Sequence, residues 1–267
     1  MQDIVHITSR DNLRVKDARQ VRDGKQRDRI FVEGARLLEE LVRSQVRIDC
    51  LFISDDGFER APELIETSGA GEIYRLTDSV FQSISDTVTS QGLVAIAERP
   101  TEMRSAIEKR LLTSSAPIVV FLHQTNNPSN LGAVIRTAEA AGAAGVIVSA
   151  GSADAFSPKA VRAAMGSSFR LPIWTDVELG EALEWAARND LRTVATEAAA
   201  TKSYSDLDWT QPHMILLGSE AHGLPDAELQ KVDERVFIPM EEPVESLNLA
   251  VACGVFLFEA RRQNSSR

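Results

Sequence analysis

Residues 117–150, PIVVFLHQTNNPSNLGAVIRTAEAAGAAGVIVSA, decide the fold of this chain. They open with PIVVFLH (117–123), a near-continuous apolar run that is typical of a central parallel strand buried on both faces. A helical pattern follows over 131–142, and AGVIVSA (144–150) has the composition of another buried strand. Because parallel strands need a crossover between them, this order predicts a parallel α/β unit.

The alternation continues on both sides of this unit. Toward the C-terminus we expect further strands at 191–198, 213–220 and 234–240, a helix that opens at Ser157, and a long closing helix over 246–262. The N-terminal third predicts strands at 29–34, 50–54, 72–76 and 92–99, with helices at 35–44, at 61–68 and from about Asp78. The pattern therefore predicts an α/β protein whose C-terminal domain has a doubly wound parallel sheet, preceded by a small α/β domain.

We divide the chain accordingly into a first domain at 1–99, a polar linker at 100–115 and a second domain at 116–267. Its 267 residues, 43% hydrophobic and 25% charged, are typical of a globular protein. We find no apolar run near the roughly 18 residues of a membrane span and no signal-peptide core, so we expect a cytoplasmic protein. The two cysteines, Cys50 and Cys253, lie in apolar surroundings, and the four histidines lack metal-ligand spacing, so we expect buried thiols and no metal.

The charge is unevenly distributed. The chain carries −10 overall, but residues 1–36 hold nine Lys and Arg against six Asp and Glu, a net of +3. The rest therefore carries −13. A basic arm on an acidic body suits local contact with RNA phosphates, whereas the alternative is a solvated helix with surface ion pairs.

Three segments carry polar residues that a scaffold does not need. The first, NNPSNLGAVIRTA (126–138), follows a buried strand and contains Asn130 and Arg136, although a capped helix with a surface arginine would also explain it. The second, LLGSEAHGLP (216–225), contains Gly218 and Glu220, and it lacks the glycine patterns of phosphate loops and dinucleotide sites.

The third segment, IPMEEPVESLNLA (238–250), runs from the end of a strand into the closing helix. Ser246 fits the N-cap position of that helix. We place Asn248 inside the apolar helix, where a buried amide requires hydrogen-bond partners.

The three segments, in this order, resemble the motifs of the SpoU (TrmH-like) family of RNA ribose 2′-O-methyltransferases. The residues that carry the resemblance are Asn130, Gly132 and Arg136 in the first segment, Gly218, Ser219, Glu220, Gly223 and Leu224 in the second, and Pro239, Ser246, Leu247 and Asn248 in the third. FVEG (31–34) and QGLVAIAE (91–98) resemble the L30e-like substrate-binding domain that precedes many such enzymes. Asn127, where family members often carry Asp, is a departure from the pattern.

The resemblance implies a trefoil knot in the C-terminal domain, a homodimer, and methyl transfer from S-adenosylmethionine to a ribose 2′-hydroxyl. It assigns the cofactor to Gly218, Ile238 and Leu247, with Thr196 nearby, and the chemistry to Arg136, Asn130, Glu220, Ser246 and Asn248. Because a guanidinium keeps its proton in proteins, we expect Arg136 to bind phosphate and stabilise the developing alkoxide rather than act as a base.

The appended N-terminal domain favours ribosomal RNA over tRNA as the substrate. Two alternatives stay open at this point, a tRNA 2′-O-methyltransferase and a non-catalytic RNA-binding or ribosome-assembly protein of the same fold. The missing glycine fingerprint argues against a dehydrogenase.

Overall fold

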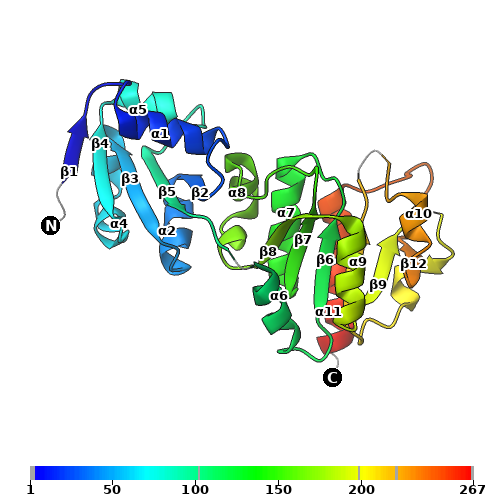
Figure 1. Cartoon of the computed structure of the whole chain (residues 1–267). Coiled ribbons are helices and arrows are strands. Elements are labelled where there is room, and N and C mark those ends of the chain that lie inside the picture. The colour runs from blue at the N-terminus through cyan, green and yellow to red at the C-terminus, as the bar shows by residue number, and fades with distance from the viewer. Residues whose placement is uncertain (1–3, 102, 198, 220–221, 266–267) are drawn as a thin grey trace. The chain divides into compact units, whose positions relative to one another are not determined.

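The structure is a computed structural model that describes residues 4–101, 103–197, 199–219 and 222–265 (Figure 1). The chain forms two compact units. The smaller unit comprises Met1–Thr101 and Phe156–Phe169, and the larger comprises Glu102–Ala155 and Arg170–Arg267.

The larger unit is built on a parallel sheet of seven strands, in the order β10-β12-β9-β11-β6-β7-β8. The strands are β6 (Ile118–Leu122), β7 (Gly145–Ser149), β8 (Ile173–Val177), β9 (Arg192–Thr196), β10 (Lys202–Ser203), β11 (His213–Leu217) and β12 (Glu234–Phe237). All residues of the adjacent strands β6, β7 and β11 are buried, as their uninterrupted apolar sequence predicts. The doubly wound α/β fold expected from the sequence is confirmed.

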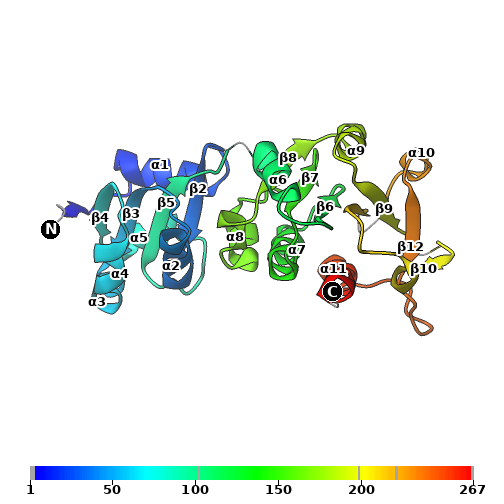
Figure 2. The same cartoon turned by 90° about the horizontal axis from the view of Figure 1, so that it is seen from below.

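Helices cover both faces of this sheet (Figure 2). They are α6 (Met103–Leu111), α7 (Pro128–Ala141), α9 (Leu179–Arg188), α10 (Asp226–Leu229) and α11 (Leu249–Ser265). On one face, α6 and α9 pack against the sheet around the fully buried Trp185. On the other face, α7 and α11 lie side by side.

Helix α6 comes from the segment that its polar composition identifies as a linker. Its Ile107 is fully buried in the core of the larger unit, and Leu111, four residues on, is also buried. The packing is tight enough to require a glycine opposite, because a Cβ at Gly145 would lie 2.5 Å from Cγ1 of Ile107. This helix is therefore part of the domain core.

The smaller unit has a mixed sheet in the order β1-β4-β3-β5-β2, in which β5 runs antiparallel to both β3 and β2. Its elements are β1 (Ile4–Ile7), α1 (Leu13–Arg22), β2 (Arg29–Glu33), α2 (Ala35–Arg43), β3 (Ile48–Ser54), α3 (Asp55–Arg60), α4 (Pro62–Thr67), β4 (Glu72–Leu76), α5 (Asp78–Ile84) and β5 (Leu93–Glu98). Helix α8 (Pro158–Ala164) also packs in this unit, where Arg162 forms an ion pair of 2.6 Å with Asp86.

The basic segment at the N-terminus is a packed helix and not an arm. Helix α1 buries Val15, Ala18 and Val21 against the sheet. Two of its arginines hold the C-terminal end of α5, because Arg19 and Arg22 donate to carbonyl oxygens in residues 83–85. These guanidinium groups satisfy carbonyls that a helix end leaves without partners, so they have a structural role.

Candidate functional site

The carboxyl ends of the central strands form the edge at which the candidate site lies. The chain moves from β6 outward through β7 and β8, and then returns to build β9, β11 and β12 on the other side of β6. The strand order reverses between β6 and β11. In open α/β sheets, ligands bind at such a switch point, outside the carboxyl ends of the strands.

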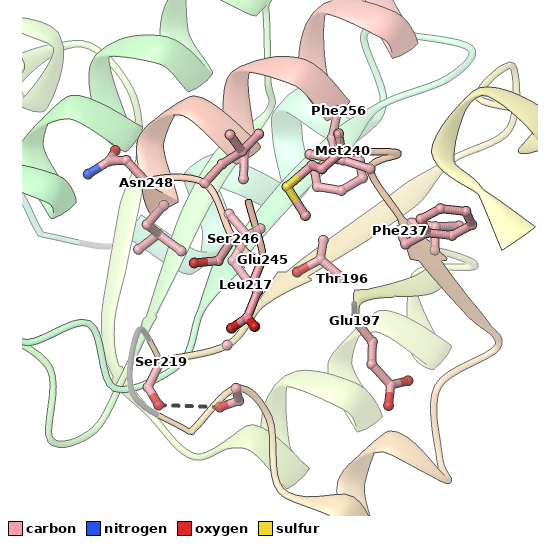
Figure 3. Close-up of a pocket in the computed structure, with 17 residues that line it drawn as sticks. Thr196, Glu197, Leu217, Ser219, Phe237, Met240, Glu245, Ser246, Asn248 and Phe256 are labelled. Carbon is pink, nitrogen blue, oxygen red and sulfur yellow. Dashed lines mark hydrogen bonds between the residues drawn. The ribbon is translucent and has the colours of Figure 1, made fainter. Parts of the chain in front are cut away.

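A cavity of about 420 Å³ lies at this edge, next to α11 (Figure 3). This volume is within the usual range for small-molecule sites. Its lining comes from the ends of β9, β11 and β12, from the segment 238–248 and from α11. The lining residues are Thr196, Glu197, Leu217, Gly218, Ser219, Gly223, Val236, Phe237, Ile238, Met240, Glu245, Ser246, Leu247, Asn248, Leu249, Ala252 and Phe256.

All four residues that the sequence assigns to the cofactor line this one cavity: Gly218, Ile238, Leu247 and Thr196. They come from segments up to 51 positions apart in the chain, which the sheet brings together. Of the five residues assigned to chemistry, Ser246 and Asn248 also line it.

The close approach of the backbone requires a glycine at position 218. A Cβ at this position would lie 2.3 Å from the carbonyl carbon of Gly223. The two strands of the turn are joined by backbone hydrogen bonds between Ser219 and Gly223, at 2.9 and 3.0 Å. A side chain at residue 218 would therefore open the turn that closes this end of the cavity.

The expected capping of the closing helix is wrong in detail. Helix α11 begins at Leu249, and Asn248 caps it, because its Oδ1 accepts a 2.9 Å hydrogen bond from the backbone N–H of Ala250. Asn248 is an exposed residue in front of the helix and not a buried one within it. Ser246, two residues earlier, is exposed at the cavity and does not cap the helix.

Asn248 also connects the third motif to the first. Its Nδ2 donates a 3.1 Å hydrogen bond to Oδ1 of Asn130, which is the third residue of α7. Asn127 caps α7, because its side-chain oxygen accepts a 3.0 Å hydrogen bond from the backbone N–H of Ser129. Asn127 is the position at which family members often carry Asp, and the Asn side chain still caps the helix. The two asparagines of the predicted site are therefore in direct contact.

Arg136 does not join them. The side chain is exposed, it is absent from the cavity lining, and within the described ranges it makes no ion pair or hydrogen bond. Six residues along a helix correspond to roughly 600°, so Arg136 lies about 120° around α7 from Asn130. Glu220, the remaining predicted residue, falls outside the described residues.

Sequence reasoning missed several residues of the cavity, among them Glu197, Glu245 and the apolar Phe237, Met240 and Phe256. Glu245 directly precedes Ser246, so its place in the motif could have indicated it. The apolar residues carry no such signal, because strand and helix cores use the same residue types.

An apolar stripe runs along the outer side of α11. Val251 and Phe258 are 53% and 49% exposed, and Leu247 is 37% exposed. Val251 and Phe258 lie seven positions apart within the helix and so share one helix face, whereas Leu247 precedes the helix and lines the cavity. Arg136 on α7 and Val251 and Phe258 on α11 are all exposed, and the two helices pack side by side (Figure 2).

Other reactive groups do not contribute to the site. Burial raises the pKa of the Cys253 and Cys50 thiols to about 12, so both are buried, uncharged thiols as expected. Within the described ranges, no three His, Cys, Asp or Glu residues gather as metal ligands would. The described helices include none long and apolar enough to cross a membrane.

Comparison with known proteins gives matches over the whole chain. Residues 117–258 match the model of the SpoU rRNA Methylase family, and residues 12–95 match the MRM3-like substrate binding domain. An uncharacterized tRNA/rRNA methyltransferase of Synechocystis is 33% identical over 98% of this chain and 95% of its own. The Bacillus subtilis 23S rRNA (guanosine(2553)-2′-O)-methyltransferase RlmP is 29% identical over 96% of this chain and 98% of its own.

Solved structures of SpoU and rRNA methyltransferases are also similar to this chain. The SpoU methyltransferase AviRb of Streptomyces viridochromogenes, in complex with the cofactor AdoMet, superposes with a TM-score of 0.84 at 29% identity, covering 96% of this chain and 99% of its own. An AdoMet-bound rRNA methyltransferase of Sinorhizobium meliloti gives 0.82 at 30% identity, covering 97% and 98%.

Proposed function

The chain belongs to the SpoU rRNA methylase family, and we propose that it methylates a ribose 2′-hydroxyl of ribosomal RNA in an active site shared between two copies of the chain. As a family member it is an RNA 2′-O-methyltransferase that uses S-adenosylmethionine. This assignment argues against the non-catalytic alternative. Ribosomal RNA is favoured over tRNA because several relatives that match most of this chain are named for 23S rRNA.

The cavity fits the cofactor. It is large enough for a nucleoside with an amino-acid tail, and it combines apolar walls from Leu217, Ile238 and Phe256 with polar groups at the strand ends. Backbone groups that follow β11 and β12 are available there for recognition of an adenine. When bound, S-adenosylmethionine supplies an activated methyl group on a sulfonium centre.

The chain's own residues have to position the ribose hydroxyl and manage its proton. Ser246 and Asn248 are exposed at the cavity, and Asn130 is fixed by its hydrogen bond to Asn248. We assign to these three the orientation of the nucleotide, and we assign Glu220 to the same group from the motif alone. Alignment of the reacting groups is worth several orders of magnitude in rate.

Arg136 is assigned to the phosphate beside the reacting ribose and to the developing negative charge on its oxygen. A guanidinium binds phosphate through two parallel hydrogen bonds, and it does not lose its proton at neutral pH. Because the exposed Arg136 does not line the cavity of its own chain, we place it in the active site of a second copy.

The apolar stripe on α11 supports the homodimer. Val251 and Phe258 would be covered by the equivalent surface of the second copy, as an isologous interface requires. The trefoil knot is a further part of the proposal. It is supported by the path of residues 238–248, which lead from β12 to α11, so that α11 packs beside α7, the helix that follows β6. We also propose a cytoplasmic location, which the bacterial 23S rRNA methyltransferases among the relatives support.

Two measurements test this function. Mapping of ribose methylation in total RNA, with and without the protein, should show one modified position in large-subunit rRNA. In single-turnover reactions at saturating RNA, Arg136→Ala should slow methyl transfer by about a thousandfold or more with near-normal cofactor affinity, and Arg136→Lys should restore little. A wild-type rate for Arg136→Ala would contradict the role given to Arg136.

A further inference from the structure

Glu245 contributes a carboxylate to the cavity, and the sequence analysis gave this residue no role. The residue belongs to the segment between β12 and α11, directly before Ser246. In Figure 3 its carboxylate is directed into the space framed by Leu217, Thr196 and Ser219.

This carboxylate is the main uncompensated charge among the described residues of the cavity. Of the described residues that line it, two are acidic, Glu197 and Glu245, and none is Lys or Arg. The Glu197 carboxylate lies 3.6 Å from the guanidinium of Arg235, which offsets its charge. For Glu245, by contrast, the described part of the chain provides no cation within ion-pair distance.

The two forms of the cofactor differ in charge. S-adenosylmethionine carries a sulfonium and an ammonium group against one carboxylate, which gives it a net positive charge. S-adenosylhomocysteine has lost the sulfonium charge with the methyl group and is neutral overall. A negative cavity therefore attracts the methyl donor more than the product.

We propose that Glu245 sets the selectivity of the cavity for the cationic methyl donor over the neutral product, so that transfer of the methyl group itself promotes product release. The inference rests on the proposed function, because it takes this cavity as the cofactor site. Glu245 is a specificity-determining residue in this scheme and takes no part in the reaction of the ribose oxygen.

The test compares three ligands by isothermal titration calorimetry: S-adenosylmethionine, S-adenosylhomocysteine and sinefungin. Sinefungin carries an ammonium-bearing carbon in place of the methylated sulfur, so it keeps the positive charge without the sulfonium. For Glu245→Gln, the affinities for S-adenosylmethionine and sinefungin should fall about tenfold, or about 1.4 kcal/mol, while that for S-adenosylhomocysteine changes less than about twofold.

Two variants serve as matched controls. Glu241→Gln removes the same charge from the same segment but outside the cavity lining, so its effect on the ratio of affinities should be about twofold or less. Glu197→Gln removes a charge that Arg235 already offsets, so its effect should lie between the two. Raising the salt from about 0.05 to about 0.5 M should reduce the preference of the wild-type protein for S-adenosylmethionine.

The possible outcomes distinguish a failure of the proposed function from a failure of the role given to Glu245. If the wild-type protein binds none of the three ligands, the proposed function is wrong and the inference falls with it. If it binds them, but Glu245→Gln changes all three affinities equally or acts no differently from Glu241→Gln, the inference is wrong while the proposed function stands.

Discussion

The position of Arg136 makes the shared active site directly testable. In one copy of the chain, Arg136 lies about 120° around α7 from Asn130, is exposed, and does not line the cavity. If the partner supplies Arg136, each complete site combines the cavity of one chain with the arginine of the other. Two variants that are each inactive should then complement one another.

The perturbation uses Arg136→Ala in one chain and Ser246→Trp in the other, where the indole fills the cavity. Each homodimer lacks one component at both sites. In the mixed dimer, the Arg136→Ala chain keeps an intact cavity and receives Arg136 from its partner, so one site of the two is complete. The mixed dimer should therefore show about half the wild-type rate per dimer.

The assay is methyl transfer to rRNA by dimers co-expressed with two affinity tags and purified on both. Light scattering shows that each variant is still a dimer, and calorimetry shows that only the Ser246→Trp cavity has lost the cofactor. An activity near zero in the mixed dimer would refute the reasoning, because a site built within one chain stays incomplete in both subunits.

Three further predictions concern the interface and the smaller unit. The double variant Val251→Asp, Phe258→Asp should be a monomer by light scattering, because two charges then replace apolar side chains that are about half exposed. The control is Leu112→Asp, which changes an apolar residue that is 88% exposed. An unchanged mass for the double variant would contradict the interface. Glu33→Gln should lower the free energy of unfolding by about 2 kcal/mol in urea melts, since the buried Glu33 carboxylate accepts from Ser85 Oγ, the N–H of Asp86, Thr87 Oγ1 and Ser90 Oγ at 2.6 to 2.8 Å; the exposed Glu39→Gln should cost less than about 0.5 kcal/mol. The hydrogen bonds from Arg29 lower the pKa of Asp17, so this pair stabilises the fold above the usual Asp pKa of about 4 and loses that effect as the pH falls through the lowered value. Arg29→Met should therefore cost about 1 kcal/mol at pH 7, with the difference from wild type vanishing near pH 2; a constant difference would contradict the linkage.

The central sheet could be predicted from the sequence because its strands are buried on both faces. The runs that contain β6, β7 and β11 are too apolar for any exposed element, and glycines or polar residues mark their ends. Strand β1 (Ile4–Ile7) gave no such signal, since it is a four-residue edge strand with two exposed residues. Helix α9 was not among the predicted elements, although Leu179, Ala182, Trp185 and Ala186 follow the spacing of a helix buried on one face.

The capping of α11 shows where local patterns stop being sufficient. Ser246 and Asn248 both have side chains suited to an N-cap, so the sequence alone supports either. The contact between Asn248 and Asn130, 118 positions away in the chain, favours the later start of the helix. That choice leaves Ser246 in the cavity, and only the tertiary structure reveals it.

The six-residue spacing between Asn130 and Arg136 in the first motif bears on whether one chain can form the whole site. Asn130 and Arg136 are both assigned to chemistry, yet residues six positions apart on one helix point about 120° away from each other. This spacing favours a motif that serves two surfaces. In this chain Asn130 contacts Asn248 before the start of α11, whereas Arg136 is exposed and does not line the cavity. The helical period thus favours a site completed by a second copy. The activity of the mixed dimer tests whether this chain forms such a site.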